Sequence, residues 1–170
     1  MLNKIKNKIV LWKGFFLVSK NWPLGLFFRI INIFRIDLLF DFDREIKLRN
    51  GIKINFGKKL DRSVMPLVVE IWQDKVYNPK GFEINPEQTI LDIGANVGNF
   101  SLFAAKLFES AIIYALEPVT ENFVLLKKNI AENSFRNILP LEFALAASCG
   151  TKEILFLTRM LGIHFLRKAQ

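Results

Sequence analysis

Two acids and two glycines in the middle of the chain have the types and spacing of a nucleoside-binding site. Asp92 ends a short apolar run, Gly94 and Gly98 follow it, and Glu117 ends a second apolar run 25 residues after Asp92. Glycine lets the chain turn sharply and approach a ligand, and an acid at a strand end can accept both hydroxyls of a ribose. The pattern predicts a nucleoside-type cofactor site, while an alternative is that Asp92 only hydrogen-bonds N–H groups of the loop.

The spacing of the glycines favours S-adenosylmethionine over a dinucleotide. A dinucleotide site has the pattern G-x-G-x-x-G, but the middle position here is Asn96, which would crowd a pyrophosphate. The chain also has no G-x-x-x-x-G-K-[ST] phosphate loop. S-adenosylmethionine has no phosphate, and it needs room for a sulfonium and an amino acid tail together with acids for its amino and ribose groups.

Alternating apolar strands and amphipathic helices would position these residues. The sequence predicts an α/β fold of the Rossmann-like type, with strands at 89–93, 112–116 and about 138–145 and helices at about 99–108 and 118–133. The short strand at 89–93, which is apolar until Asp92, suits a parallel strand covered on both faces. A fourth strand is predicted at 152–157, antiparallel to its predecessor because the connection is short.

The N-terminal part is predicted to form an extension to this core. Residues 1–40 are basic and apolar together and predict an amphipathic helical segment, and residues 41–88 predict a hairpin around Asn50-Gly51 and a helix at 62–78. The core would then span 89–157, followed by a divergent tail at 158–170. Residues 1–60 hold 13 Lys/Arg against 4 Asp/Glu, whereas residues 61–170 hold 11 against 12. The basic segment suits an anionic surface such as a membrane, although a solvated face or a helix packed on the core also explains it.

Four stretches of the sequence resemble the FkbM family of S-adenosylmethionine-dependent methyltransferases. The stretch LDIGANVGNFS at 91–101 resembles the family's motif I. The other three are ALEP at 115–118 with ENF at 121–123, LLKKNIAEN at 125–133, and FALA at 143–146 with Gly150 after it. The resemblance covers about residues 45–157 and is strong at 89–156, and it implies a class I methyltransferase sheet.

The resemblance also implies a role for each cofactor-binding residue. The methionine end of S-adenosylmethionine would be lined by Asp92, Gly94, Ala95, Asn96 and Gly98. Glu117 would hold the ribose, and Phe143 and Ala144 would border the adenine. Tyr77 is a further candidate near the mouth of the site, with ordinary packing as the alternative. The implied reaction is methylation of a small-molecule or glycan acceptor, at a hydroxyl of a saccharide or secondary metabolite.

The sequence lacks the strand that should lie on the far side of the first strand, which in the family usually has the pattern K-x-D-x-E-G. The sheet is therefore expected to be incomplete, with an open edge at residues 90–93. Three explanations remain open: a truncated product, one half of a split enzyme with a complementing chain, and a degenerate homologue that dimerises. No catalytic base is assigned, because the regions that usually supply it are missing.

Composition excludes several other functions. A single Cys149 and a single His164 provide neither an internal disulfide nor a zinc cluster, so no metal site is predicted. A nucleic-acid methyltransferase is disfavoured because no N-P-P-Y or D-P-P-Y motif is present to hold a flipped base. No apolar run of 18 residues and no signal peptide is found, so we expect a cytoplasmic protein, with membrane contact only through residues 1–40. The alternative function is a non-catalytic membrane-surface or partner-binding protein with a vestigial cofactor fold.

Overall fold

The centre of the molecule is a three-stranded parallel sheet. The computed structural model describes residues 13–23, 45–57, 64–74, 76–77, 88–148, 150, 155–160 and 163–168. The sheet has the order β3-β4-β5, with β3 at Thr89–Ile93, β4 at Ile112–Leu116 and β5 at Ile138–Leu141. Its parallel strands alternate with helices along the chain, which confirms the predicted α/β, Rossmann-like class.

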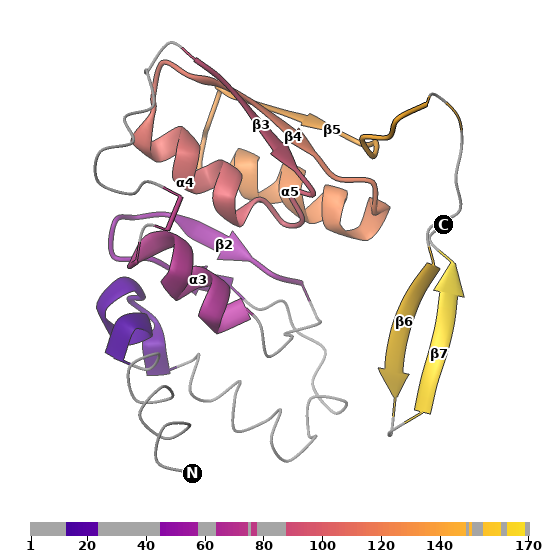
Figure 1. Ribbon diagram of the computed structural model, residues 1–170. Coiled ribbons are helices and arrows are strands. Elements are labelled where there is room, and N and C mark those ends of the chain that lie inside the picture. Colours follow the sequence, from indigo (N-terminus) through magenta and orange to yellow (C-terminus); the bar gives the residue numbers. More distant parts are fainter. Residues whose placement is uncertain are drawn as a thin grey trace.

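Two helices connect the strands and lie on one face of the sheet (Figure 1). These helices are α4 at Asn99–Leu107 and α5 at Thr120–Glu132. Each makes a crossover between parallel neighbours, and crossovers of the same hand carry successive helices to the same face. The inward side of α5 holds Phe123, Leu126 and Ile130, as predicted.

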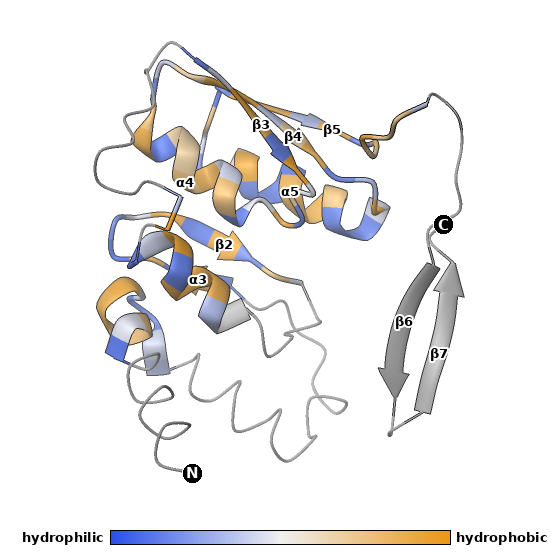
Figure 2. Ribbon diagram, viewed as in Figure 1, coloured by the Kyte–Doolittle hydropathy of each residue, from blue (hydrophilic) through white to orange (hydrophobic). Residues whose placement is uncertain are grey.

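The buried side of α4 differs from the prediction. The apolar spacing of the sequence predicts Phe100, Phe103, Ala104 and Leu107 on the buried side of this helix. Leu107 is exposed, however, whereas Leu102 and Ala105 are buried. The reason is that α4 contacts β4 on one side and α3 (Val64–Trp72) on another, so more than one face of the helix is covered. The bands of hydrophobic and hydrophilic residues along α4 and α5 are visible in Figure 2.

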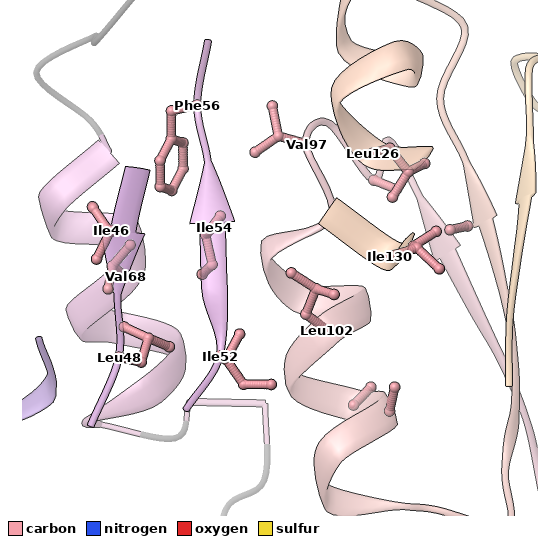
Figure 3. Packing of buried hydrophobic residues seen from close by; sticks show 14 of the residues in the cluster. Ile46, Leu48, Ile52, Ile54, Phe56, Val68, Val97, Leu102, Leu126 and Ile130 are labelled. Carbon is pink, nitrogen blue, oxygen red and sulfur yellow. The ribbon is translucent and has the colours of Figure 1, made fainter. Parts of the chain in front are cut away.

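A small hairpin packs on the side of α4 and α5 that faces away from the sheet (Figure 1). It consists of β1 at Glu45–Lys47 and β2 at Lys53–Asn55, which pair antiparallel. Its apolar side chains meet those of α3, α4, α5 and the glycine loop in one cluster (Figure 3). The labelled members of this cluster are Ile46, Leu48, Ile52, Ile54, Phe56, Val68, Val97, Leu102, Leu126 and Ile130.

The turn of this hairpin is wider than predicted. Asn50-Gly51 was expected to form a two-residue turn with positive φ at both positions, but in the hairpin only Gly51 has a positive φ, of 95°. The N–H of Gly51 donates to the carbonyl of Leu48 at 3.1 Å, and the N–H of Leu48 donates to the carbonyl of Ile52 at 2.7 Å. This is the three-residue loop in which a single glycine takes the left-handed position.

Asparagine side chains bond to both edges of the hairpin. On the β1 edge, Asn21 donates to the carbonyl of Glu45 and accepts from the N–H of Lys47, both at 2.8 Å. On the β2 edge, α5 supplies Asn129 and Asn133. Because an open strand edge invites association with other chains, these side chains fix the hairpin within the fold.

The second face of the parallel sheet is largely open. Leu91 and Ile93 of β3 are 51% and 58% exposed, and Ile112 and Leu139 of the neighbouring strands are also exposed. The prediction that 89–93 is covered on both faces is therefore wrong for the described residues, because both helices of the sheet lie on its other face. Within the described sheet β3 pairs with β4 alone, so the predicted open edge is present.

The C-terminal elements also differ from the prediction. β5 ends at Leu141 rather than near 145, because its partner β4 ends at Leu116, and residues 142–146 are exposed without regular structure. The predicted fourth strand is β6 at Leu155–Met160, which pairs antiparallel with β7 at Ile163–Lys168 and not with β5. The pairing of β6 with β7 thus replaces the expected pairing, and the tail at 158–170 contributes to both strands.

Some predictions on the N-terminal part fall outside the described residues. Of the amphipathic segment 1–40 the structure describes only 13–23, which are helical at 13–18. The predicted helix at 62–78 is the shorter α3, and Val68 and Val69 of its apolar stripe are buried. The sequence also offers Asp61 or Ser63 as a cap for the start of this helix, and both lie outside the described residues. Among the described residues, no helix is both long enough and apolar enough to cross a membrane.

Candidate cofactor site

The structure brings Asp92, the glycine loop and Glu117 together at one edge of the sheet. Asp92 is the next-to-last residue of β3 and pairs with Ala115 of β4, so Glu117 follows the end of β4 close to the end of β3. In parallel sheets ligands bind at this carboxyl edge of the strands. The two acids therefore stand on neighbouring strands on either side of the loop that joins β3 to α4.

The loop reverses direction through three left-handed residues. Gly94, Asn96 and Gly98 have φ values of 79°, 52° and 89°, and asparagine is among the few non-glycine residues that take this conformation readily. The N–H groups of Gly94 and Ala95 both donate to the carbonyl of Leu116 at 2.9 Å. The loop is thus anchored to the end of β4, and Gly98 leads directly into α4.

Glu117, which follows Leu116 at the end of β4, also holds the loop. It is only 4% exposed, and its Oε2 accepts a hydrogen bond from the backbone N–H of Asn96 at 2.8 Å. Its Oε1 accepts from the N–H of Val119 at 2.9 Å and from the side-chain amide of Asn122 at 3.3 Å. A carboxylate has about four acceptor positions, so these three donors leave one position for a ligand.

Asp92 is in a setting that disfavours its charge. Burial raises the pKa of its carboxyl above the usual 3.8, and the charge of Glu117 raises it further. The hydroxyl of Ser101 in α4 opposes this shift by donating to Oδ2 of Asp92 at 2.5 Å. Two acids close enough to repel each other would both be stabilised by a cationic ligand.

The two glycines have different surroundings. A Cβ at Gly98 would lie 2.6 Å from Cδ1 of Leu126, so a larger residue there collides with α5. A Cβ at Gly94 would meet nothing within 4 Å. A side chain at Gly98 would therefore force Leu126 to shift, while the space beside Gly94 is open to a ligand.

One buried donor beside the loop has no partner among the described residues. Asn99 begins α4, and its Oδ1 accepts from Nε1 of Trp72 at 2.7 Å, but its Nδ2 is buried without a hydrogen-bond acceptor. Buried polar groups in proteins are nearly always paired, so an orphaned donor here fits a site that accepts a polar ligand. With the acid pair and the open space at Gly94, these residues fit a nucleoside that carries an amino acid tail.

Phe143 and Ala144, which are expected to border the adenine, follow the end of β5 at the same edge of the sheet. Leu141, the last residue of β5, accepts a hydrogen bond from the N–H of Glu117 at 3.0 Å, and both Phe143 and Ala144 are exposed. Tyr77 is half-exposed, and its ring lies 4.9 Å from the ring of Phe100 in the first turn of α4. This contact is what the packing interpretation of Tyr77 expects.

The sequence interpretation did not single out Ser101, Asn122 and Asn129, which support the site. Asn129 is fully buried on the inward side of α5, between Leu126 and Ile130. A polar residue at an apolar position of a helix was the signal that could have revealed it, since a buried amide needs partners. Among the described residues, no group of three or more His, Cys, Asp or Glu could hold a metal ion.

The chain is similar in sequence to known methyltransferases. It is 30% identical over 98 residues to the 31-O-demethyl-FK506 methyltransferase FkbM of Streptomyces tacrolimicus, across 56% of this chain and 37% of that protein. It is 32% identical over 94 residues to the methyltransferase sdnD of Sordaria araneosa, across 55% of this chain and 36% of that protein. No protein-family model matches the chain.

Solved structures with a related arrangement include two TYW2 proteins. The P. horikoshii TYW2 complex with MeSAdo gives a TM-score of 0.46 at 19% identity, over 62% of this chain and 37% of that one. The M. jannaschii TYW2 complex with AdoMet gives 0.45 at 19% identity, over 58% and 42%. The two sequence relatives, of whose length the chain spans little more than a third, confirm the resemblance to the FkbM-type methyltransferases over about half of the chain.

Proposed function

We propose that this chain forms the cofactor-binding part of an S-adenosylmethionine-dependent methyltransferase. The observation that carries the proposal is the pair of acids, Asp92 and Glu117, on either side of a glycine loop whose Gly94 faces open space. S-adenosylmethionine is a cation overall, with a sulfonium, an ammonium and one carboxylate, so its charge complements the two acids. The similarity to FkbM and sdnD supports the same cofactor class.

The geometry gives Asp92 and Glu117 different tasks. Asp92 would pair with the ammonium group, which lowers the pKa that burial and Glu117 have raised. Glu117 would accept one ribose hydroxyl at its remaining position while it continues to hold Asn96. A second hydroxyl would take the place of the Asn122 amide, which at 3.3 Å makes the longest of the three bonds to Glu117.

We further propose that the acceptor is a hydroxyl group. The name of the FkbM relative specifies a 31-O-demethyl substrate, so that relative methylates an oxygen. When bound, S-adenosylmethionine supplies a methyl group on a sulfonium leaving group. The acceptor oxygen forms a bond to the methyl carbon as the carbon–sulfur bond breaks, the electron pair stays on sulfur, and the hydroxyl proton passes to a base. We assign that base to no described residue, because Asp92 is bonded to Ser101 of α4 and Glu117 is bonded to the loop at Asn96.

We also propose that additional polypeptide covers the open face of the sheet, either a complementing chain or a second copy. Leu91 and Ile93 are more than half exposed, and β3 has no second neighbour within the described sheet. Parallel sheets are almost always covered on both faces. β3 is the strand at the open edge, and the glycine loop follows β3. Polypeptide added along this strand would therefore lie next to the proposed site.

Isothermal titration of the purified chain with S-adenosylmethionine tests the function. We expect saturable binding of S-adenosylmethionine and S-adenosylhomocysteine, and no binding of NAD. The comparison variant is Gly94→Val, whose side chain fills the open space beside the loop and should abolish binding. Its circular dichroism spectrum should still show a folded chain. A folded wild-type chain that binds neither adenosyl compound would refute the proposal.

A further inference from the structure

The helix α5 is joined to the outer edge of β2 by two asparagines. Oδ1 of Asn129 accepts from the N–H of Asn55 at 2.8 Å, and its Nδ2 donates to the carbonyl of Asn55 at 2.9 Å. One turn later, Oδ1 of Asn133 accepts from the N–H of Lys53 at 2.9 Å, and its Nδ2 donates to the carbonyl of Lys53 at 2.7 Å. Each side-chain amide thus pairs with the backbone of one strand residue as a neighbouring strand would.

The spacing of the two asparagines along the helix matches the spacing of the strand residues that they bind. Four residues of an α-helix rise about 6 Å, and two residues of a strand advance about 6.6 Å. Asparagines four residues apart on α5 can therefore reach alternate residues of β2. The other edge of β2 is paired with β1, so both of its edges are bonded.

Asn129 makes one contact that Asn133 does not. Its Nδ2 also donates to the carbonyl of Val97 at 2.8 Å, and Val97 lies in the glycine loop between the left-handed residues Asn96 and Gly98. The corresponding third bond of Asn133 goes to the carbonyl of Asn129 in its own helix, at 2.7 Å. Asn129 is fully buried, so a lost bond there is not replaced by water at the surface.

The glycine loop is therefore held from two directions. On the side of the sheet, the carbonyl of Leu116 and the carboxylate of Glu117 hold Gly94, Ala95 and Asn96. On the side of α5, Asn129 holds Val97, and Leu126 leaves no room for a Cβ at Gly98. The group that fixes Val97 is the same amide that fixes the hairpin at Asn55.

We propose that Asn129 is a positioning residue of the cofactor loop and that it couples the N-terminal hairpin to cofactor binding. The coupling rests on the proposed function, whereas the positioning of the loop does not. By reciprocity, a ligand that orders the loop also strengthens the attachment of the hairpin at Asn55.

The decisive comparison is between Asn129→Asp and Asn133→Asp in the full chain. Both substitutions add one negative charge and replace the side-chain donor by an acceptor, so each removes one hydrogen bond to a carbonyl of β2. Only Asn129→Asp also removes the hydrogen bond to the carbonyl of Val97. Hydrogen exchange without ligand should be about tenfold faster at Ala95 and Gly98 in Asn129→Asp than in Asn133→Asp. Equal exchange of the loop in the two variants would overturn the positioning role.

Titration with S-adenosylmethionine tests the coupling separately. Asn129→Asp should weaken binding about tenfold, and Asn133→Asp by less than about twofold. If Asn129→Asp does not fold, hydrogen exchange of the wild type with and without ligand still tests the coupling. The bound ligand should slow exchange of the Asn55 N–H. Slower exchange in the loop with unchanged exchange at Asn55 would overturn the coupling. If the wild type binds no ligand, the proposed function and the coupling both fail, while the ligand-free comparison still tests the positioning.

Discussion

Replacing Asp92 by asparagine should stabilise the free protein at neutral pH and weaken cofactor binding. Burial first, and then the charge of Glu117, raise the pKa of Asp92 above 3.8 in the folded chain. An acid whose pKa is higher in the folded than in the unfolded state binds protons more readily when folded. Its contribution to stability therefore falls as the pH rises through 3.8 and up to the folded-state pKa. Asparagine does not ionise, so its contribution to stability does not fall with pH. The gain in unfolding free energy of Asp92→Asn over the wild type should therefore be absent below pH 3.8 and complete near neutral pH.

The loss of binding can be scaled from the contact that would disappear. A hydrogen bond to a charged group contributes about 1.5–3 kcal/mol, which corresponds to an increase in Kd of about 10- to 150-fold. The same reasoning gives a pH dependence for the wild type. The ammonium group needs an ionised carboxylate as its partner. As the pH is lowered, Asp92 should take up its proton at a higher pH than an aspartate with the ordinary pKa, so the affinity for S-adenosylmethionine should begin to fall at that higher pH.

The assay combines urea denaturation over a pH series with calorimetric titration of the cofactor. The control is Ser101→Ala, which keeps the carboxylate but removes the hydroxyl that donates to it at 2.5 Å. This variant should lose about 1.5–3 kcal/mol of unfolding free energy at neutral pH, the opposite sign to Asp92→Asn. If Asp92→Asn is less stable than the wild type at neutral pH, the charge of Asp92 supports the fold and our reasoning is wrong. An unchanged Kd would remove Asp92 from the ligand site.

Two further predictions concern the loop and the open face. Gly98→Ala should lower the unfolding free energy by about 1–3 kcal/mol and Gly94→Ala by only about 1 kcal/mol. Both glycines have positive φ, but only a Cβ at Gly98 collides with Leu126, and the reverse order in urea denaturation would contradict this explanation. Ile93→Lys should change the unfolding free energy by less than about 0.5 kcal/mol, because Ile93 is 58% exposed, and it should reduce any self-association seen by light scattering. A large loss of stability in the monomer would show that Ile93 is covered within the chain.

Local patterns predicted the part of the fold that depends on neighbours in sequence. Strand, glycine loop and helix follow one another between Thr89 and Leu107, and the hairpin has its turn at Asn50-Gly51. The details that failed depend on distant partners. Leu107 is exposed because α3 determines which faces of α4 are covered, and the strand β5 ends where β4 ends.

The support of the cofactor loop was also beyond local prediction. Asn129 reaches Asn55, which is 74 residues earlier in the chain, and a buried amide in the middle of a helix does not indicate which backbone it will bind. Asn133 is the C-cap residue of α5, as its place at the end of the helical pattern suggests, and Ser134 after it has the positive φ. Its side chain also reaches Lys53 of the hairpin, a contact that the local sequence does not indicate.

This dependence changes what can be regarded as the cofactor-binding unit. The sequence resemblance is strong from residue 89 onward, but the hydrophobic cluster that holds α4, α5 and the loop includes Ile54 and Phe56 of the hairpin segment. Without residues 45–57, Leu126 and Leu102 would lose apolar neighbours, and Asn129 would lose two of its three hydrogen bonds. The predicted boundary at 88–89 therefore crosses a continuous core. Any shortened chain made to study cofactor binding must retain the hairpin, because the geometry of the loop is fixed partly from that side.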